Sequence, residues 1–277
     1  MTLLGKTRTF ICLSLLICSS GSYAAEPLAA RPGAVASPDQ YGAATAELIL
    51  RAGGNAVDAA IATAFTLAVT YPEAGNIGGG GFMTLWFDGK PYFLDYREMA
   101  PAAASRDMYL NDDKEPIENL SIIGHQASGV PGTVMGMWQA HQRFGSLPWQ
   151  QLLQPAIQYA AEGFIVANDQ YQYRSDLATQ LAGKTNFNDY FGRMQAGSNF
   201  KQPELAATLQ RIAKTGPEDF YHGDTAKLLV AEMQRGNGLI TLQDLAGYKS
   251  GWRDPVITPW HGAQLITTAP PVQAALH

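Results

Sequence analysis

The sequence predicts a mixed fold of the α+β class. Three observations support this. Two helical patterns stand near the N-terminus, a pair of strand-like segments with a turn signal follows, and residues 130–250 read as mostly helical. The length of 277 residues is ample for a buried core in one large domain or two small ones.

The first two predicted helices are bounded by capping residues and glycines. Ser37-Pro38 offers a hydroxyl N-cap followed by proline at the first helical position, and the helix should run to about Arg51 and end at Gly53-Gly54. Asn55 should cap the second helix, over residues 57–69, which is apolar nearly all round and should be buried. Asp58 on that helix needs a partner if it is buried, and we interpret it as a capping or packing acid.

A β-hairpin is the next predicted element. Residues 82–87 are rich in strand formers, Asp88-Gly89 is a hairpin turn signal, and residues 91–96 return as a second strand. Arg97 should lie at the end of that second strand, where functional sites are commonly placed. Residues 102–126 read as irregular and polar.

The remainder of the chain is predicted to be helical until a last pair of strands. Glycines at positions 163, 216 and 236 should end the helices expected over residues 149–162, 203–215 and 224–235. We expect a short turn and helix over residues 239–250, and a strand pair over residues 256–267 around His261-Gly262. The main helices are expected over residues 132–144, 149–162, 203–215 and 224–235.

The N-terminus has the pattern of a secretory signal peptide over residues 1–24. Lys6 and Arg8 precede an apolar stretch over residues 10–17, and Ser22-Tyr23-Ala24 fits a small-x-small cleavage site. The alternative, a membrane anchor, is disfavoured because the apolar stretch is too short to span a bilayer. We therefore expect a protein of the periplasm, or a secreted one, once the signal is removed.

Charge and cysteine content exclude several classes of partner and cofactor. The net charge is −5, and removing the two cations of the signal brings it to −7, which argues against binding to nucleic acid or an anionic membrane. Both cysteines, Cys12 and Cys18, lie in the signal, so no disulfide, thiolate metal site or cysteine nucleophile is expected after it. The five histidines show no metal-ligand spacing, and we expect no metal and no cofactor.

The segment with the most specific sequence is a run of four glycines, residues 78–81, followed by Arg97. A phosphate-binding loop is a poor interpretation, because no Lys-Ser or Lys-Thr follows and Met83 stands where a dinucleotide fingerprint needs its last glycine. A close crossing of two backbones before a strand explains the glycines better. The planar guanidinium of Arg97 suits a carboxylate, although it could instead pair with Glu98 or another acid to stabilise a loop.

Several long motifs together resemble the γ-glutamyltransferase (glutathione hydrolase) family, and only its large-subunit part. The resemblance implies an N-terminal-nucleophile hydrolase fold, the αββα sandwich, here incomplete, with strands left unpaired and apolar helix faces uncovered. It also implies that Arg97 holds the α-carboxylate of the γ-glutamyl donor. The motifs are Ala52-Gly53-Gly54-Asn55-Ala56-Val57-Asp58, Asn76 through Phe82, Asp95-Tyr96-Arg97-Glu98-Met99-Ala100-Pro101, Ala127 through Val134, and Gly238 through Leu245.

The resemblance implies an activity that this chain would not perform alone. A complete member would transfer the γ-glutamyl group of glutathione to water, an amino acid or a peptide, through an N-terminal threonine of the small subunit. Residues 25–271 resemble the large subunit, so we expect no catalytic residue in this chain and a small subunit as partner. Two alternatives remain: an acylase of the same superfamily acting on β-lactam side chains, and a non-catalytic γ-glutamyl-binding or assembly fragment.

The last six residues, 272–277, do not resemble the family. Members read Pro-Pro-Pro-Ser-Ser-Gly-Gly where this chain has Ala269-Pro270-Pro271 and then Val272. Codons for Ser-Ser-Gly-Gly-Leu-Ala that lose their first base can read Val-Gln-Ala-Ala-Leu, which is the sequence found here. A frameshift therefore explains the tail, and a genuine short paralogue is the alternative.

Overall fold

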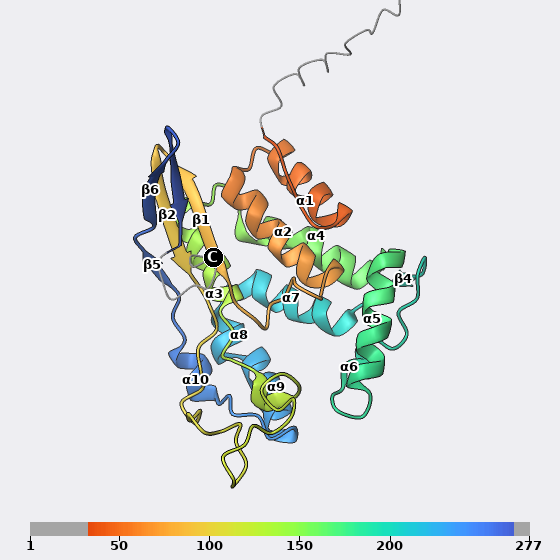
Figure 1. The fold of residues 1–277 in the computed structure, drawn as a ribbon. Helices are drawn as coiled ribbons and strands as arrows, with labels where there is room; N and C mark the ends of the chain where they lie inside the picture. The colour runs from red at the N-terminus through yellow and green to blue at the C-terminus, as the bar shows by residue number, and fades with distance from the viewer. Residues whose placement is uncertain (1–32, 269–277) are drawn as a thin grey trace, which may run out of the picture. The chain divides into compact units, whose positions relative to one another are not determined.

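The computed structural model describes residues 33–268, and all structural statements below concern this part of the chain (Figure 1). The predicted signal (1–24) and the predicted tail (272–277) lie outside the described residues. The helices are α1 Gln40–Arg51, α2 Ala56–Thr70, α3 Thr133–Phe144, α4 Trp149–Glu162, α5 Asn168–Leu181, α6 Phe187–Phe191, α7 Pro203–Thr215, α8 Glu218–His222, α9 Asp224–Arg235 and α10 Leu242–Gly247, with a 3₁₀ turn at His125–Ala127. The strands are β1 Phe82–Phe87, β2 Lys90–Asp95, β3 Phe164–Ile165, β4 Asn199–Phe200, β5 Gly251–Arg253, β6 Val256–Trp260 and β7 Ala263–Thr267.

The first helix begins later than its sequence suggested. Asp39, and not Ser37, is the N-cap of α1, and its carboxylate accepts a hydrogen bond of 2.6 Å from the Gly42 amide. The predicted start at Ser37-Pro38 is therefore wrong. An ionised carboxylate complements the positive end of the helix dipole better than a hydroxyl does, which accounts for the shift. The predicted end is confirmed, since α1 finishes at Arg51.

The second helix confirms both its predicted cap and its predicted burial. The Asn55 side chain accepts from the amides of Val57 and Asp58, and the Asp58 carboxylate accepts from the Asn55 amide in return. Asp58 is fully buried and also accepts from the Ser146 hydroxyl and amide, the latter at 3.0 Å. Asp58 is thus the capping and packing acid that the sequence indicated, and it ties α2 to the loop before α4.

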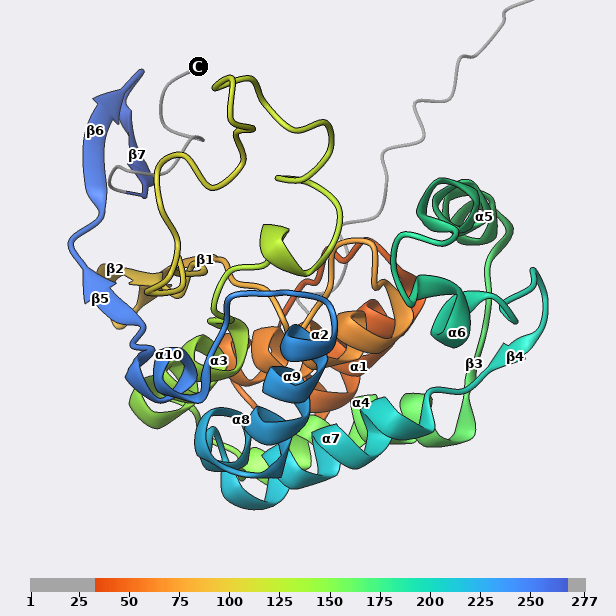
Figure 2. The ribbon, with the colours of Figure 1, turned by 90° about the horizontal axis from the view of Figure 1, so that it is seen from below.

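Four helices, α1, α2, α4 and α7, form a packed helical layer (Figure 2). In it α2 packs against both α1 and α4, and α4 packs against α7. The Phe65 ring of α2 meets the Trp149 ring of α4 edge-on, with centroids 5.5 Å apart. Trp149 in turn donates from its indole nitrogen to the Ile212 carbonyl of α7 at 3.0 Å. Side chains in this layer that are fully buried include Ile61, Phe65, Leu152, Leu153, Leu209 and Ile212.

The predicted hairpin lies in a three-stranded antiparallel sheet of order β1-β2-β5. Asp88 and Gly89 both have positive φ, 47° and 74°, as a tight two-residue hairpin turn requires. The strand pair β6–β7, turning at His261-Gly262, is also confirmed. Strand β5 was not predicted, since its three residues are too few to show a period.

Helix α5 is the longest element that sequence reasoning missed. Its sequence is polar and lacks a clear apolar face, so the helical period is weak. It is anchored instead by a buried ion pair between Arg174 and Glu73, with Nη2 to Oε2 at 2.8 Å. Arg174 also donates to the Thr70 carbonyl at the end of α2. The anchor depends on residues about a hundred positions apart in the sequence, which no local pattern reveals.

Candidate functional site

The backbone of the glycine run lies directly against the backbone of the segment that carries Arg97. Gly81 and Tyr96 exchange backbone hydrogen bonds of 3.3 and 3.0 Å, which extends the pairing of β1 with β2. A Cβ atom built on Gly80 would lie 2.6 Å from the Glu98 nitrogen. A side chain is therefore excluded at Gly80, and the interpretation as a close backbone crossing is confirmed there, whereas a Cβ atom at Gly78 would have open space around it.

The other side of the glycine run faces the N-terminus of α3. The Gly79 carbonyl accepts from the amides of Gly132 and Thr133 at 2.7 and 3.0 Å. Asn76 fixes the start of the run, because its side-chain oxygen accepts from the Gly79 amide at 2.8 Å and from the Thr133 hydroxyl at 3.1 Å. The glycine run thus holds the end of β2 and the start of α3 together.

Arg97 follows β2 with its main chain fixed and its side chain exposed. Its amide donates to the Asp95 side chain at 3.1 Å, and its carbonyl accepts from the Tyr248 hydroxyl at 2.8 Å. The guanidinium carbon lies 6.0 Å from the centre of the Phe82 ring, within reach of a cation–π contact. Within residues 33–268 the Arg97 guanidinium forms no ion pair, so the alternative pairing with Glu98 is not present there.

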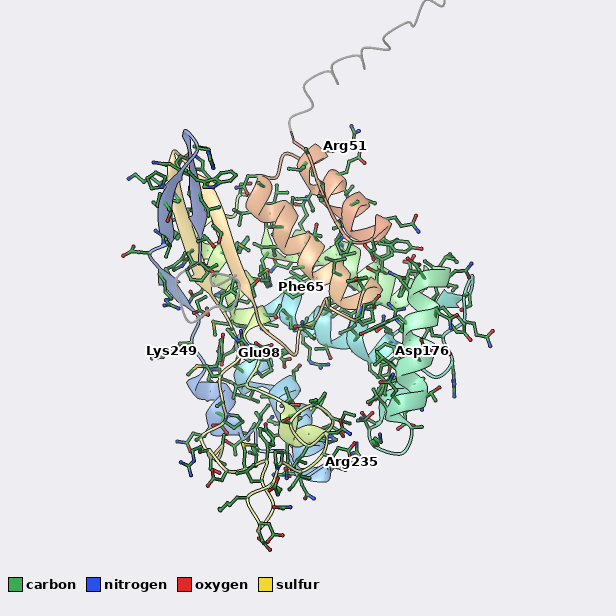
Figure 3. All side chains as sticks on the ribbon, in the orientation of Figure 1. Arg51, Phe65, Glu98, Asp176, Arg235 and Lys249 are labelled. Atoms are coloured by element: carbon green, nitrogen blue, oxygen red, sulfur yellow. The ribbon has the colours of Figure 1, made fainter. Side chains whose placement is uncertain are left out.

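A cleft of about 380 Å³ surrounds this guanidinium. Arg253 reaches across to Asp95, with Nη1 to Oδ2 at 2.9 Å, and so neutralises that carboxylate. With Asp95 neutralised, Arg97 and Lys249 face only Glu98 as an opposing charge among the lining residues, and the cleft favours an anion. Glu98 and Lys249 are labelled in Figure 3, near the end of the sheet next to α10. The lining residues are Phe82, Asp95, Arg97, Glu98, Met99, Tyr248, Lys249, Gly251 and Arg253.

Two tyrosines beside the cleft remain protonated at neutral pH. Burial raises the pKa of Tyr96 to about 12. Burial also raises the pKa of Tyr248, and the nearby carboxylates of Asp95 and Glu98 raise it further. The Tyr248 hydroxyl is therefore a hydrogen-bond donor throughout the physiological range. Sequence reasoning identified Arg97 but missed Tyr248, Lys249 and Arg253, because they come from a segment about 150 positions further along the chain.

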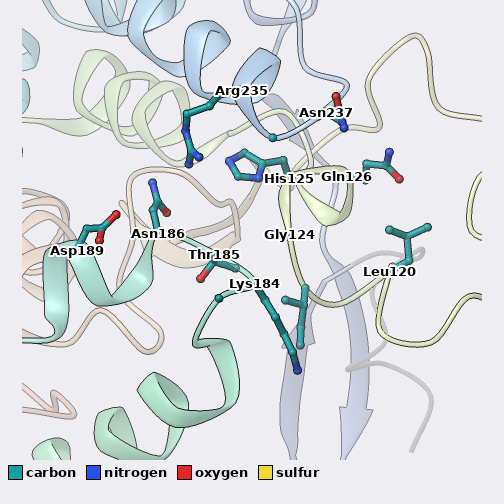
Figure 4. A pocket seen from close by; sticks show the side chains of 13 residues that line it. Leu120, Gly124, His125, Gln126, Lys184, Thr185, Asn186, Asp189, Arg235 and Asn237 are labelled. Atoms are coloured by element: carbon teal, nitrogen blue, oxygen red, sulfur yellow. The ribbon is translucent and has the colours of Figure 1, made fainter.

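A second cavity, of about 460 Å³, lies between the loop around His125, the loop before α6 and the end of α9 (Figure 4). Three of the side chains that line it, those of His125, Asn186 and Arg235, bind the same carboxylate. The Glu232 carboxylate accepts from His125 at 2.8 Å, from Asn186 at 2.9 Å and from Arg235. The hydrogen bond from Arg235 has the largest effect on the pKa of Glu232, and the one from His125 the second largest. Together they lower this pKa to about 2. Because these three side chains already have a partner, whereas the Arg97 guanidinium forms no ion pair within residues 33–268, the cleft at Arg97 is the better candidate for ligand binding.

Within residues 33–268 there is no group of three or more histidine, cysteine, aspartate or glutamate side chains placed to hold a metal ion. Among the helices of the same residues, none has both the length and the apolar character needed to cross a bilayer.

Comparisons with known proteins show which family this chain resembles. The Gamma-glutamyltranspeptidase family model matches residues 42–276. The glutathione hydrolase proenzyme of Pseudomonas aeruginosa is 66% identical over 239 residues, which are 86% of this chain and 43% of that protein. This chain therefore spans less than half the length of that relative.

Solved structures give the same result for the fold. The γ-glutamyltranspeptidase of Pseudomonas nitroreducens, complexed with L-DON, is 66% identical with a TM-score of 0.85, over 86% of this chain and 71% of that one. A cephalosporin acylase of Bacillus halodurans is 28% identical with a TM-score of 0.73, over 81% of this chain and 44% of that one. The predicted fold class, an α+β N-terminal-nucleophile hydrolase fold in its large-subunit part, is confirmed. The chain belongs to the γ-glutamyltranspeptidase (glutathione hydrolase) family.

Proposed function

We propose that this chain supplies the donor-binding part of a glutathione hydrolase, and that Arg97 binds the α-carboxylate of the γ-glutamyl group. One observation carries the proposal: an exposed guanidinium without an ionic partner in residues 33–268 stands in a cleft, on a main chain held at both its amide and its carbonyl. A guanidinium binds a carboxylate through two parallel hydrogen bonds, and a fixed main chain lowers the entropy lost on binding.

The chemistry of the proposed reaction requires a nucleophile from another segment. A threonine at a new N-terminus, with its α-amino group as base, attacks the γ-carbonyl carbon of the donor, and the leaving amine takes up the proton. Water or an acceptor amine then attacks the resulting acyl-enzyme ester and releases the threonine. We place this threonine on a small subunit, which corresponds to the part of the Pseudomonas aeruginosa relative that this chain does not match. The chain alone is then inactive.

The cellular location and the partners follow from the same proposal. The predicted signal over residues 1–24 directs the protein to the periplasm or the outside, where glutathione or other γ-glutamyl compounds are its substrates. Association with the small subunit is supported by large apolar side chains that the strands leave exposed, among them Trp86 of β1 and Trp260 of β6.

Two other functions deserve a direct comparison with this one. An acylase acting on β-lactam side chains is supported by the similarity to the cephalosporin acylase, but at 28% identity against 66% for the γ-glutamyltranspeptidase. An arginine that binds a free α-carboxylate also favours a γ-glutamyl donor. A non-catalytic γ-glutamyl-binding fragment would keep the Arg97 cleft and need no nucleophile.

The test is a reconstitution. Residues 25–277 are purified and assayed for hydrolysis of γ-glutamyl-p-nitroanilide, first alone and then with the small-subunit segment of the Pseudomonas aeruginosa relative, produced with its threonine at the N-terminus. We expect turnover only in the mixture. Turnover by the chain alone would refute the placement of the nucleophile, and turnover of a β-lactam side chain but not of the γ-glutamyl compound would favour the acylase. Binding of glutathione without turnover in the mixture would favour the non-catalytic fragment.

A further inference from the structure

Arg97 and Tyr248 meet although 151 positions separate them in the sequence. We propose that Tyr248 is a positioning residue for donor binding: its hydroxyl holds the main chain of Arg97, so that the guanidinium stays in the cleft. This inference rests on the proposed role of Arg97 as the carboxylate-binding group. It assigns to Tyr248 no contact with the donor itself.

The hydrogen bond from Tyr248 is short and shielded from water. Its hydroxyl donates to the Arg97 carbonyl at 2.8 Å, and the tyrosine is only 4% exposed. On the other side of the same residue, the Arg97 amide donates to Asp95, which Arg253 also holds. The two anchors fix both peptide groups that flank the Arg97 Cα, and this sets the direction in which the side chain leaves the backbone.

The room for the Tyr248 hydroxyl is provided by Gly132. A Cβ atom at Gly132 would clash with both the Tyr248 hydroxyl and the Tyr96 carbonyl. The φ of Gly132 is −115°, which any residue can adopt, so the glycine is required by space and not by its conformation. The turn before α3 is therefore shaped around this hydrogen bond.

The ring of Tyr248 is held in place by a second tyrosine. It stacks on Tyr221 of α8 with ring centroids 5.7 Å apart and an interplanar angle of 10°. Tyr221 is itself fixed, since its hydroxyl donates to the Pro131 carbonyl at 2.9 Å and accepts from the Met135 amide at 3.3 Å. Tyr248 thus transmits the position of α8 and α3 to Arg97. The raised pKa of Tyr248 keeps its hydroxyl protonated, so this hydroxyl can donate its hydrogen bond at every pH at which activity would be measured.

The first arm of the test measures kinetics in the reconstituted mixture. Tyr248→Phe keeps the ring and its stacking and removes only the hydroxyl. Loss of one hydrogen bond of ordinary strength predicts a rise of roughly fivefold in KM for γ-glutamyl-p-nitroanilide, with kcat within about twofold. For the analogue 4-aminobutyryl-p-nitroanilide, which lacks the α-carboxylate, KM should not change. An equal rise for both compounds would show that Tyr248 acts on the fold in general and would overturn the inference.

The second arm measures amide hydrogen exchange of residues 96–99 in the purified chain and needs no activity. Tyr248→Phe should speed exchange there by roughly fivefold. The matched control is Tyr41→Phe, which removes a hydroxyl that donates to the Ile165 carbonyl at 2.9 Å and should leave residues 96–99 unchanged. Unchanged exchange in Tyr248→Phe overturns the inference. If exchange rises but Arg97→Ala leaves the KM unaltered, the positioning role stands and the proposed function fails.

Discussion

The helical layer and the strands of this protein complete their apolar packing to very different degrees. In the layer formed by α1, α2, α4 and α7, the large side chains at the helix contacts, such as Phe65, are fully buried. On the strands, Trp86 is 59% exposed, Trp260 64% and Leu265 54%. The helices cover one another, and β2 buries Phe93 and Leu94, whereas β1, β6 and β7 present apolar side chains that no segment within residues 33–268 covers.

This difference supports the proposal that a partner covers the strands. The resemblance to the family implied uncovered apolar surface on both strands and helices. In the described part of the chain the large exposed apolar side chains on the main helices are scattered, as with Leu48 of α1 and Leu228 of α9, whereas those of β6 and β7 gather on a single hairpin. Scattered apolar residues are normal on a surface, but a group of them indicates an interface. The strands are thus the side on which we place the small subunit.

The largest expected effect is a loss of stability in the helical layer. Phe65→Ala removes a fully buried ring that packs edge-on against Trp149, and it should lower the free energy of unfolding by about 3–5 kcal/mol. Leu265→Ala in β7, at 54% exposure, should change it by less than about 0.5 kcal/mol. Urea denaturation of the purified chain measures both. Equal losses for the two variants would mean that the strands are as well packed as the helices, and the comparison would fail.

The next effect concerns the site at the end of the sheet. Arg97→Ala should raise KM for γ-glutamyl-p-nitroanilide by about two orders of magnitude in the reconstituted mixture, because a charged contact to the donor is lost. Stability should hardly change, since the side chain is exposed. Arg97→Lys should restore little, because an ammonium lacks the planar fork.

The control for Arg97 is a donor without an α-carboxylate, for which the substitution should make no difference. If KM for that donor rises as much as for the γ-glutamyl compound, Arg97 has a structural role and the site assignment is wrong. Self-cleavage of a full-length version that carries Arg97→Ala should proceed normally, because the arginine binds the donor and not the peptide bond that is cut.

Local sequence predicted the elements whose signals lie within a few residues of each other. Asn55 and Asp58 form a capping box, Asp88-Gly89 forms the hairpin turn, and the glycines at 163, 216 and 236 end their helices as predicted. Helix α5 was missed because Arg174 and Glu73, about a hundred positions apart, anchor it. Of the candidate site, Arg97 was found through its motif, whereas the residues that hold it, Tyr248 and Arg253, become its neighbours only in the folded chain.

A smaller effect is expected for the apolar hairpin β6–β7. Trp260→Ser should weaken association with the small-subunit segment by roughly tenfold. An aromatic side chain buried in an interface contributes at least about 1.4 kcal/mol to the free energy of binding. The stability of the isolated chain should be unchanged, since Trp260 is mostly exposed in it. Sedimentation or calorimetric titration of the two segments measures the association. The matched control is Leu228→Ser on α9, exposed to a similar degree at 62%, which should leave the association unchanged.

The smallest effect is a pH-dependent contribution from the cavity in Figure 4, whose lining residues belong neither to the helical layer nor to the sheet. Arg235 and His125 lower the pKa of Glu232 to about 2, against about 4.3 in an unfolded chain. A carboxyl whose pKa is lower in the folded chain stabilises the folded state at pH values above its pKa in the unfolded chain. This stabilisation is lost as the pH falls from about 4.3 toward 2.

Glu232→Gln should therefore lower the free energy of unfolding at pH 7 by less than about 1 kcal/mol, because the carboxylate is 35% exposed and screened by solvent. The difference from the unaltered chain should shrink between pH 4 and pH 3, where urea denaturation can still be followed. Glu47→Gln, which removes the exposed pair with Arg51 on α1, serves as the comparison and should have a still smaller effect at pH 7. A difference for Glu232→Gln that stays constant from pH 7 to pH 3 would show that the hydrogen bonds of its side chain, and not its charge, hold the three segments around this cavity together.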